Sequence, residues 1–179
     1  MSTITTYTGI RFDPIHPDAD LIHIEDIAHA LAMLCRAGGH CKDFYSVGQH
    51  SINCAREAEA RGLSQKIRLG CLLHDASEAY LSDVTRPVKA ELPGYLKIER
   101  PLQEMIWQKW LTEPLTEEEE ALVFQIDNEL LLHEFLALMD TRLSDSIPDL
   151  ASAPTFAFNG FNACEQDFLC LFRLLTAEK

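Results

Sequence analysis

The stretch LLHDASEAYLSD, residues 72–83, places an imidazole and several carboxylates at the end of an apolar run. His74 is followed directly by Asp75, and Glu78 comes one helical turn later, so a helix through this stretch would project all three from one side. Burying such groups is costly unless they are paired or bind a metal ion. The spacing therefore predicts a polar cluster that either forms ion pairs or holds a metal.

Two other predicted helices carry polar residues at positions where the pattern indicates core. His50 lies in the first turn of one, and Asp127 lies in the middle of another among apolar helical neighbours: Val123, Phe124, Leu130 and Leu131. A single inward Asp is often satisfied by Arg, Lys or backbone donors, and a single His beside a helix cap is usually a surface residue. The ordered set His50, His74, Asp75 and Asp127, spread over three helices, instead favours a metal centre.

The elements that must position these residues are predicted to be helices, with no alternating strand pattern. Capping-box pairs begin three of them: Ser46 with Gln49, Thr116 with Glu119, and Asn162 with Glu165. The predicted helices span residues 25–36, 46–62, 64–78, 96–111, 116–140 and 162–175. Pro87 indicates a loop, and Pro101 indicates a kink or a later helix start. We therefore expect an all-α, single-domain helical bundle.

The length, the cysteine spacing and the apolar runs of the chain predict one cytoplasmic domain. The chain has 179 residues, which is enough to bury a core, and its six cysteines lack CxxC spacing, so reduced thiols are expected. No apolar run reaches the ~20 residues that cross a bilayer, and the N-terminus lacks the pattern of a signal peptide. The net charge of −13 argues against binding long nucleic acid through its phosphates, but a small anionic substrate remains compatible with it.

Three segments in order, SVGQHS, LLHDASEAYLSDVTRPVK and FQIDNELLLHE, resemble the HD superfamily of metal-dependent phosphohydrolases. They are most similar to its bacterial nucleoside 5′-monophosphatase branch, and the resemblance covers about residues 26–140. It implies an HD-type helical core with the metal site at residues 25–143. An N-terminal arm, 1–24, would precede this core, and a C-terminal segment, 144–179, would pack on it through its helix.

The resemblance also implies roles for the matching residues. The metal ligands would be His50, His74, Asp75 and Asp127. The catalytic and water-orienting carboxylates would be Glu78 and Asp83.

Binding of the substrate phosphate is assigned less directly. Arg36 resembles the phosphate-binding Arg of the family by its position before SVGQHS, but the aromatic residue that follows that Arg in the monophosphatases is missing. His40 and Lys42 are possible substitutes at the mouth of the site, and Lys89 and Arg86 are further candidate cations.

Two imidazoles and two carboxylates suit one divalent transition metal ion, either Mn, Co, Fe, Ni or Zn. The implied function is hydrolysis of a small phosphomonoester, with a (deoxy)nucleoside 5′-monophosphate as the expected substrate, by metal-activated water. Two alternatives stay open: a non-catalytic HD module that binds a nucleotide as a sensor, and an HD-type di-iron oxygenase, which needs further ligands. The expected partner is thus a small phosphorylated molecule, and a homodimer is one alternative for the oligomeric state.

Overall fold

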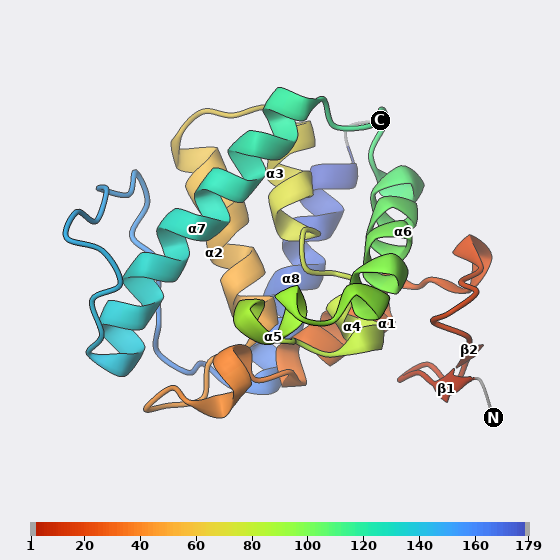
Figure 1. The fold of residues 1–179 in the computed structure, drawn as a ribbon. Helices are drawn as coiled ribbons and strands as arrows, with labels where there is room; N and C mark the ends of the chain where they lie inside the picture. Colours follow the sequence, from red (N-terminus) through yellow and green to blue (C-terminus); the bar gives the residue numbers. More distant parts are fainter. Residues whose placement is uncertain (1–2, 178–179) are drawn as a thin grey trace.

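Helices surround the predicted site, as the sequence indicates. The computed structural model describes residues 3–177, so residues 1–2 of the expected arm and 178–179 of the expected C-terminal segment lie outside it. In chain order (Figure 1), the elements are β1 (Ile4–Thr5), β2 (Arg11–Phe12), η1 (Ala19–Leu21), α1 (Ile24–Met33), η2 (Arg36–Gly39), α2 (Val47–Ala60), α3 (Gln65–Leu72), α4 (Glu78–Leu81), α5 (Arg86–Ala90), α6 (Pro93–Trp110), α7 (Glu117–Met139) and α8 (Phe161–Thr176). The all-α prediction is confirmed, with one short antiparallel hairpin, β1–β2, in the N-terminal arm.

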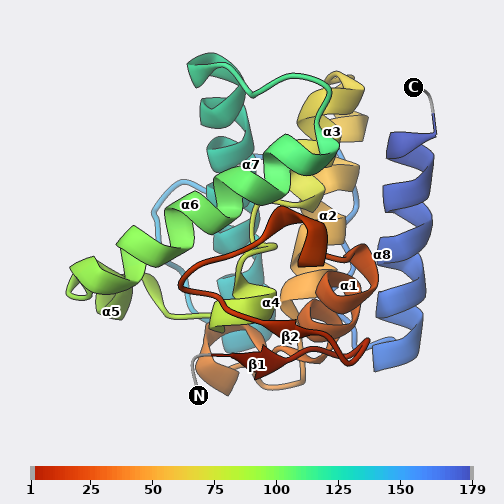
Figure 2. The same ribbon diagram turned by 90° about the vertical axis from the view of Figure 1, so that its right-hand side faces the viewer.

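The centre of the bundle is α2, which packs against α1, α3, α7 and α8. Apolar side chains from these five helices form one continuous core, as shown by the burial of Leu31, Cys54, Leu72, Leu130 and Phe168. In Figure 2, α6 crosses the front of the bundle and α8 closes one side of it. The core thereby fixes α2 on several sides, and the α2 face that carries His50 is directed toward α7 and the end of α3.

Two predicted helices end earlier than expected. The first ends at Met33, so Arg36 lies in the 3-10 turn η2 and not at a helix terminus. The helix that follows Ser64 ends at Leu72, so His74 and Asp75 lie in the turn between α3 and α4. The expectation that these two residues and Glu78 project from one continuous helix is therefore wrong.

The two prolines also lie in helices. Pro87 belongs to the short helix α5, which replaces the predicted loop; in the first turn of a helix the missing N–H of proline leaves no hydrogen bond unmade. Pro101 lies inside α6, which begins at Pro93, so the later start is wrong. Within residues 3–177, no helix combines the length and the apolar character that crossing a membrane requires.

The predicted helix caps agree with the structure in part. The Ser46 side chain caps α2 by accepting a hydrogen bond from the backbone, as expected. The predicted cap of the last helix is wrong, because α8 begins after Gly160 with no side-chain cap, and Asn162 lies inside it. Glu165 instead accepts from His29 of α1 at 2.8 Å, which ties α8 to the bundle.

Candidate metal centre and phosphate site

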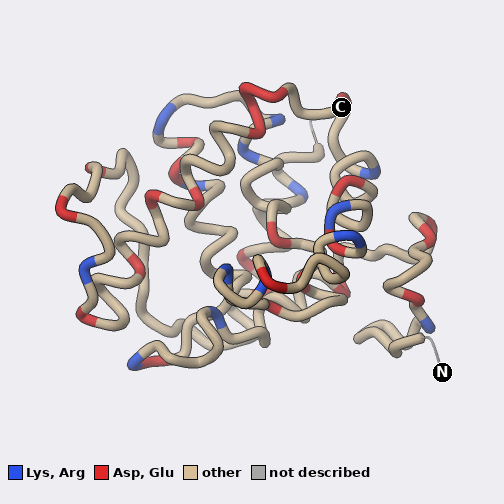
Figure 3. Tube along the Cα trace, viewed as in Figure 1, with Lys and Arg blue, Asp and Glu red and all other residues tan. Residues whose placement is uncertain are grey.

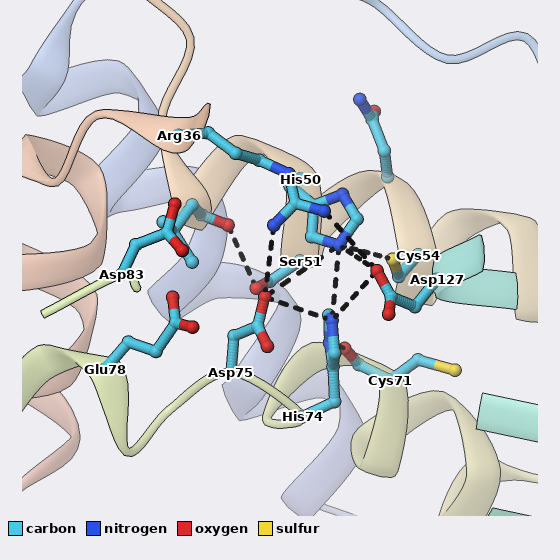
Figure 4. Close-up of polar contacts among 12 residues, drawn as sticks. Arg36, His50, Ser51, Cys54, Cys71, His74, Asp75, Glu78, Asp83 and Asp127 are labelled. Atoms are coloured by element: carbon cyan, nitrogen blue, oxygen red, sulfur yellow. Dashed lines mark hydrogen bonds and ion pairs between the residues drawn. The ribbon is translucent and has the colours of Figure 1, made fainter. Parts of the chain in front are cut away.

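The four predicted metal ligands converge on one point between α2, α7 and the turn after α3 (Figure 4). The Nε2 atoms of His50 and His74 lie 3.2 Å apart. Asp75 Oδ2 lies 3.2 Å from His74 Nε2, and Asp127 Oδ1 lies 3.1 Å from His50 Nε2. The two crossed imidazole–carboxylate distances are 4.0 and 3.9 Å. Atoms bound to one metal at about 2.0–2.2 Å are roughly 3–4 Å from each other, so this spacing fits a single ion.

The outer nitrogen of each imidazole shows which face is free to bind a metal. His74 Nδ1 lies 2.7 Å from the Cys71 carbonyl oxygen, which only accepts, so Nδ1 carries the hydrogen. His50 Nδ1 likewise donates to a carboxylate oxygen of Glu134 at 2.5 Å. When both imidazoles are neutral, as metal binding requires, both Nε2 atoms present lone pairs to each other and to the carboxylates of Asp75 and Asp127. Four such atoms repel unless a cation lies among them, so the residues fit a divalent metal ion.

The pKa shifts of the clustered residues also favour a cation at their centre. Burial alone would raise the pKa of both Asp75 and Asp127, but the neighbouring imidazoles keep both pKa values below the ordinary range. Burial and Arg36 oppose protonation of His50, yet contacts that include Glu134 and Asp127 raise its pKa well above the ordinary value. The cluster thus stabilises added positive charge at its centre.

Cys54 adds a sulfur to this donor set. It lies one turn after His50 on α2, with Sγ 3.4 Å from His50 Nε2, and His50, Cys54 and His74 form a group that could hold a metal ion. Burial raises the pKa of the Cys54 thiol to about 11, so without a metal the sulfur keeps its proton. Sequence reasoning treated Cys54 only as a buried thiol, although its spacing from His50 places both on one helical face.

Glu134 is a second residue that sequence reasoning missed. It is 3% exposed, and its carboxylate accepts hydrogen bonds from His50, from Arg36 Nε at 2.9 Å and from the Tyr45 hydroxyl at 3.0 Å. Burial would raise its pKa, but Arg36 and His50 lower it to about 2, so Glu134 is ionised. It lies seven residues after Asp127 and therefore on the same face of α7. This spacing is the sequence feature from which Glu134 could have been identified as a member of the site.

Arg36 lies directly over the predicted metal ligands. Its Nη1 is 3.3 Å from Asp75 Oδ2 and its Nη2 is 3.4 Å from Asp127 Oδ1, while Nε donates to Glu134. The guanidinium therefore touches the same carboxylate oxygens that face the two imidazoles. This position, reached from the turn η2, places a two-pronged donor beside the centre.

Glu78 and Asp83 lie on the other side of Asp75 from Asp127 (Figure 4). Burial and the neighbouring Asp75 and Asp83 raise the pKa of Glu78 to about 10, and its Oε2 is buried without a hydrogen-bond partner. Burial also raises the pKa of Asp83, although Arg36 opposes the shift, and Asp83 Oδ2 accepts from the Ala37 backbone N–H at 3.1 Å. Glu78 therefore carries a proton near neutral pH, beside a second carboxyl group.

The other candidate cations divide into two groups. Arg86 and Lys89 of α5 line the site, with Arg86 Nη2 2.6 Å from Asp127 Oδ2 and Lys89 Nζ 3.5 Å from Glu78 Oε1. Figure 3 shows the basic segments of η2 and α5 close together at the lower centre of the bundle. His40 is exposed and Lys42 pairs with Asp140 at the surface, and neither lines the site.

Two cavities meet at these residues. One, of about 350 Å³, lies between η2, α5 and the second half of α7. The other, of about 520 Å³, lies between α5, α6 and the first half of α7, and it is lined by Trp107 and Phe124 among others. Both include Asp75 and Asp127, so these two of the four predicted ligands lie at the boundary between the two cavities. Phe124 was one of four apolar residues expected to surround Asp127, but its side chain is 63% exposed and does not bury that carboxylate.

Comparison with known proteins relates the chain to two bacterial relatives. The chain is 36% identical over 115 residues to "Uncharacterized protein YfdR" of Escherichia coli K12, an alignment that covers 64% of this chain and 62% of the relative. It is 42% identical over 98 residues to an uncharacterized protein of Rhodobacter capsulatus, covering 51% of this chain and 50% of the relative. The chain thus spans less than two thirds of each relative. No protein-family model matches the chain.

Proposed function

We propose that this chain is a metal-dependent phosphohydrolase that cleaves a small phosphomonoester, with a nucleoside 5′-monophosphate as substrate. The observation that carries the proposal is the contact of one guanidinium, that of Arg36, with Asp75 and Asp127, two of the four residues whose donor atoms fit a metal ion. Such a site offers positive charge from both a metal and an arginine to the same anionic group. The sequence resemblance to HD phosphohydrolases supports the same reading.

His50, His74, Asp75 and Asp127 would hold the ion, with Glu134 fixing the orientation of His50. A divalent ion held by these residues would supply a water of lowered pKa and positive charge beside the phosphate. The chain itself supplies the remaining positive charge, which is needed because carboxylates alone would repel the substrate. Arg36 suits the phosphate because its fork donates two parallel hydrogen bonds, and Arg86 and Lys89 lie at the edge of the same cavity.

Glu78 and Asp83 would carry the protons. In hydrolysis the water oxygen forms a bond to phosphorus, the bond from phosphorus to the ester oxygen breaks, and that oxygen takes up a proton. Two adjacent carboxyl groups with raised pKa values hold fewer charges than two isolated ones, so one can accept the proton of water while the other donates to the leaving oxygen.

The test uses the metal-loaded protein and a panel of nucleoside 5′-monophosphates, with release of inorganic phosphate as the readout. Asp83→Asn should keep the metal and lower kcat by about 10²–10⁴-fold, as expected for an acid–base group. His74→Ala should lose metal and turnover together. Absence of phosphate release by the unmutated protein would refute the proposal.

The two alternative functions give different outcomes in the same experiment. Nucleotide binding without phosphate release would indicate the non-catalytic sensor. Two irons per chain would indicate the di-iron oxygenase, but within residues 3–177 one group of three clustered donors is found. A content of one metal per chain is therefore expected.

A further inference from the structure

The sulfur of Cys54 belongs to the group of atoms that faces the predicted metal position. Cys54 is 1% exposed and follows His50 by four residues on α2, so the two side chains share one face of the helix. Its Sγ lies 3.4 Å from His50 Nε2, and the Nε2 atoms of His50 and His74 lie 3.2 Å apart. The three atoms all lie within 4.8 Å of one another. The centre therefore offers two nitrogens and a sulfur in addition to its carboxylates.

These distances fit one ion bound by all three atoms. Zinc binds nitrogen at about 2.0–2.1 Å and sulfur at about 2.3 Å, so two donors at tetrahedral angles are roughly 3.3–3.6 Å apart. The sulfur–nitrogen and nitrogen–nitrogen distances of 3.4 and 3.2 Å are close to this range. The third pair, Cys54 Sγ and His74 Nε2, lies within 4.8 Å, so at most a small movement of one side chain brings all three atoms to one ion.

A metal on His50 would deprive the Cys54 thiol of its acceptor. The thiol is within hydrogen-bond distance of His50 Nε2, and an ion bound to that nitrogen takes up the same lone pair. The buried sulfur then lies beside a cation, and thiolate is a strong ligand for soft transition metals. Coordination exchanges the thiol proton for the ion, and the proton passes to water.

The sulfur and the carboxylates lie on different sides of the centre. Asp75 and Asp127 line both cavities, whereas Cys54 and His50 line neither. Arg36 also contacts both carboxylates, so they share their charge between the ion and a guanidinium. A sulfur ligand on the core side would hold the ion and leave the cavity side open to water and substrate.

We infer that Cys54 binds the metal ion as a thiolate together with His50 and His74, and that it makes the centre selective for Zn and Co over Mn. Thiolates select soft ions, whereas carboxylates suit Mn. The sulfur is absent from the ligand set of two histidines and two aspartates that the resemblance to HD phosphohydrolases implies. The inference rests on the metal centre of the proposed function and narrows the choice of ion, and it makes no use of the substrate.

The first test uses Co(II) as the probe. A thiolate bound to Co(II) gives an intense charge-transfer band in the near ultraviolet, which nitrogen and oxygen ligands do not give. The full chain, freed of metal by a chelator and kept reduced, should develop this band as Co(II) is added. Cys54→Ala should abolish the band at saturating Co(II) while one ion still binds, because four predicted ligands remain. Cys71→Ala, the matched control, should keep the band, since Cys71 is also buried but its sulfur is directed away from the cluster (Figure 4).

The second test measures which ions the sulfur favours, by competition with a chromophoric chelator. Cys54→Ala should lower the affinity for Zn by about 100-fold or more, because a direct ligand contributes more than the roughly 10- to 100-fold of a residue that only hydrogen-bonds a ligand. The affinity for Mn should fall by less than about threefold, since a thiolate adds little to the binding of a hard ion. Asp127→Ala, by contrast, should lower the affinity for both ions.

Three results would overturn the inference. A Co(II) complex of the unmutated chain without the band, or a band that survives in Cys54→Ala, would show that the sulfur does not bind the ion. Equal losses of Zn and Mn affinity in Cys54→Ala would show that the residue supports only the packing of α2. If Cys54→Ala does not fold, as judged by circular dichroism, Cys54→Ser, which keeps nearly the same volume, should show the same loss of the band and the same Zn-specific loss.

Failure of the proposed function remains distinguishable, because both tests are made without substrate. A band that depends on Cys54, with no phosphate release from any nucleoside 5′-monophosphate, would refute the phosphohydrolase and retain the sulfur ligand. Phosphate release by a chain whose Co(II) complex lacks the band would overturn the sulfur ligand and retain the phosphohydrolase.

Discussion

The outer end of α7, its exposed first turn, and its inner end, the buried stretch from Asp127 to Glu134, carry the same type of side chain in opposite settings. Its first turn holds four consecutive glutamates, residues 117–120, at the upper edge of the bundle (Figure 3). Thr116 and Glu119 form a reciprocal capping box there, and Lys66 Nζ lies 2.6 Å from Glu119. The helix dipole and water stabilise this charge, which accounts for the acidic run without any role in a site.

Farther along the same helix, Asp127 and Glu134 are buried, with 7% and 3% exposure. Water does not stabilise them, and their partners come from other elements: His50 from α2 and Arg36 from η2. Lys66 of α3 also reaches Glu119, so a cationic partner alone does not distinguish the carboxylates of the site; burial away from water does. Substitutions at the two ends should therefore affect different properties of the protein.

The largest effect is expected at the inner end. Asp127→Ala removes one of four predicted ligands, and it removes one of the three carboxylate partners of Arg36 and the carboxylate partner of Arg86. We expect the affinity for a divalent metal to fall by more than about 100-fold, and turnover to disappear with it. This loss is larger than the one caused by removing a residue that only hydrogen-bonds a metal ligand. Metal content measured by atomic emission checks this, and a full ion with normal turnover would show that the fourth ligand lies elsewhere.

A smaller loss is expected at Glu134. Glu134→Gln keeps the shape of the side chain but removes the charge that holds the His50 Nδ1 proton and the Arg36 guanidinium. Metal affinity should fall by about 10- to 100-fold, as for other partners of ligating histidines. Tyr45→Phe, which removes the third hydrogen bond to Glu134 and the bond that Tyr45 accepts from Asn53, is the matched control and should retain most of the affinity. Equal losses in the two variants would contradict an orienting role for the carboxylate.

The cations that accompany the two ends are also expected to differ. Arg36→Lys keeps the charge but loses the two-pronged contact, so KM for the phosphoester should rise about 10-fold while metal content is unchanged. Lys66→Arg beside Glu119 is the matched exchange at the outer end and should leave KM unaltered. Unchanged kinetics in both Arg36→Lys and Arg36→Ala would transfer phosphate binding to another cation, with Lys89 in the cavity as the first choice.

The smallest effect is expected at the outer end. Thr116→Ala removes the helix cap and should lower the free energy of unfolding by about 0.5–2 kcal/mol, measured by urea denaturation, with metal affinity and KM unchanged. Glu118→Ala, an exposed neighbour outside the cap pair, should change stability by less than about 0.5 kcal/mol. A loss of metal binding in Thr116→Ala would show that the two ends are not independent.

Local signals in the sequence were sufficient for most of the helices. Ser46 and Thr116 each cap a helix as predicted, because a cap depends on a side chain and a backbone N–H only three residues away. The inward position of Asp127 also followed from local pattern, since it occupies the apolar face of a long helix. The all-α class is the sum of such short-range signals.

Contacts between distant residues decided what local pattern could not. Gln103 of α6 accepts from Ser77 N–H at 3.0 Å and donates to the Leu73 carbonyl at 2.7 Å. These bonds satisfy backbone groups of a buried turn, so the chain can leave the helix at Leu72 and turn His74 and Asp75 toward His50. Gln49 behaves similarly, because its side chain leaves the expected cap to bind carbonyls more than 100 residues later.

The sequence by itself determined which residue types are available for the proposed chemistry and which helices carry most of them. Only the tertiary structure decided that Arg36 contacts two predicted ligands directly and that Cys54 and Glu134 join the cluster. It also decided that Arg86 and Lys89 line the site while His40 and Lys42 remain at the surface. The physical reason is the separation along the chain over which each interaction acts. Helix propensity and capping act within a few residues, whereas the partner of a buried charge is chosen by packing between helices far apart in the chain.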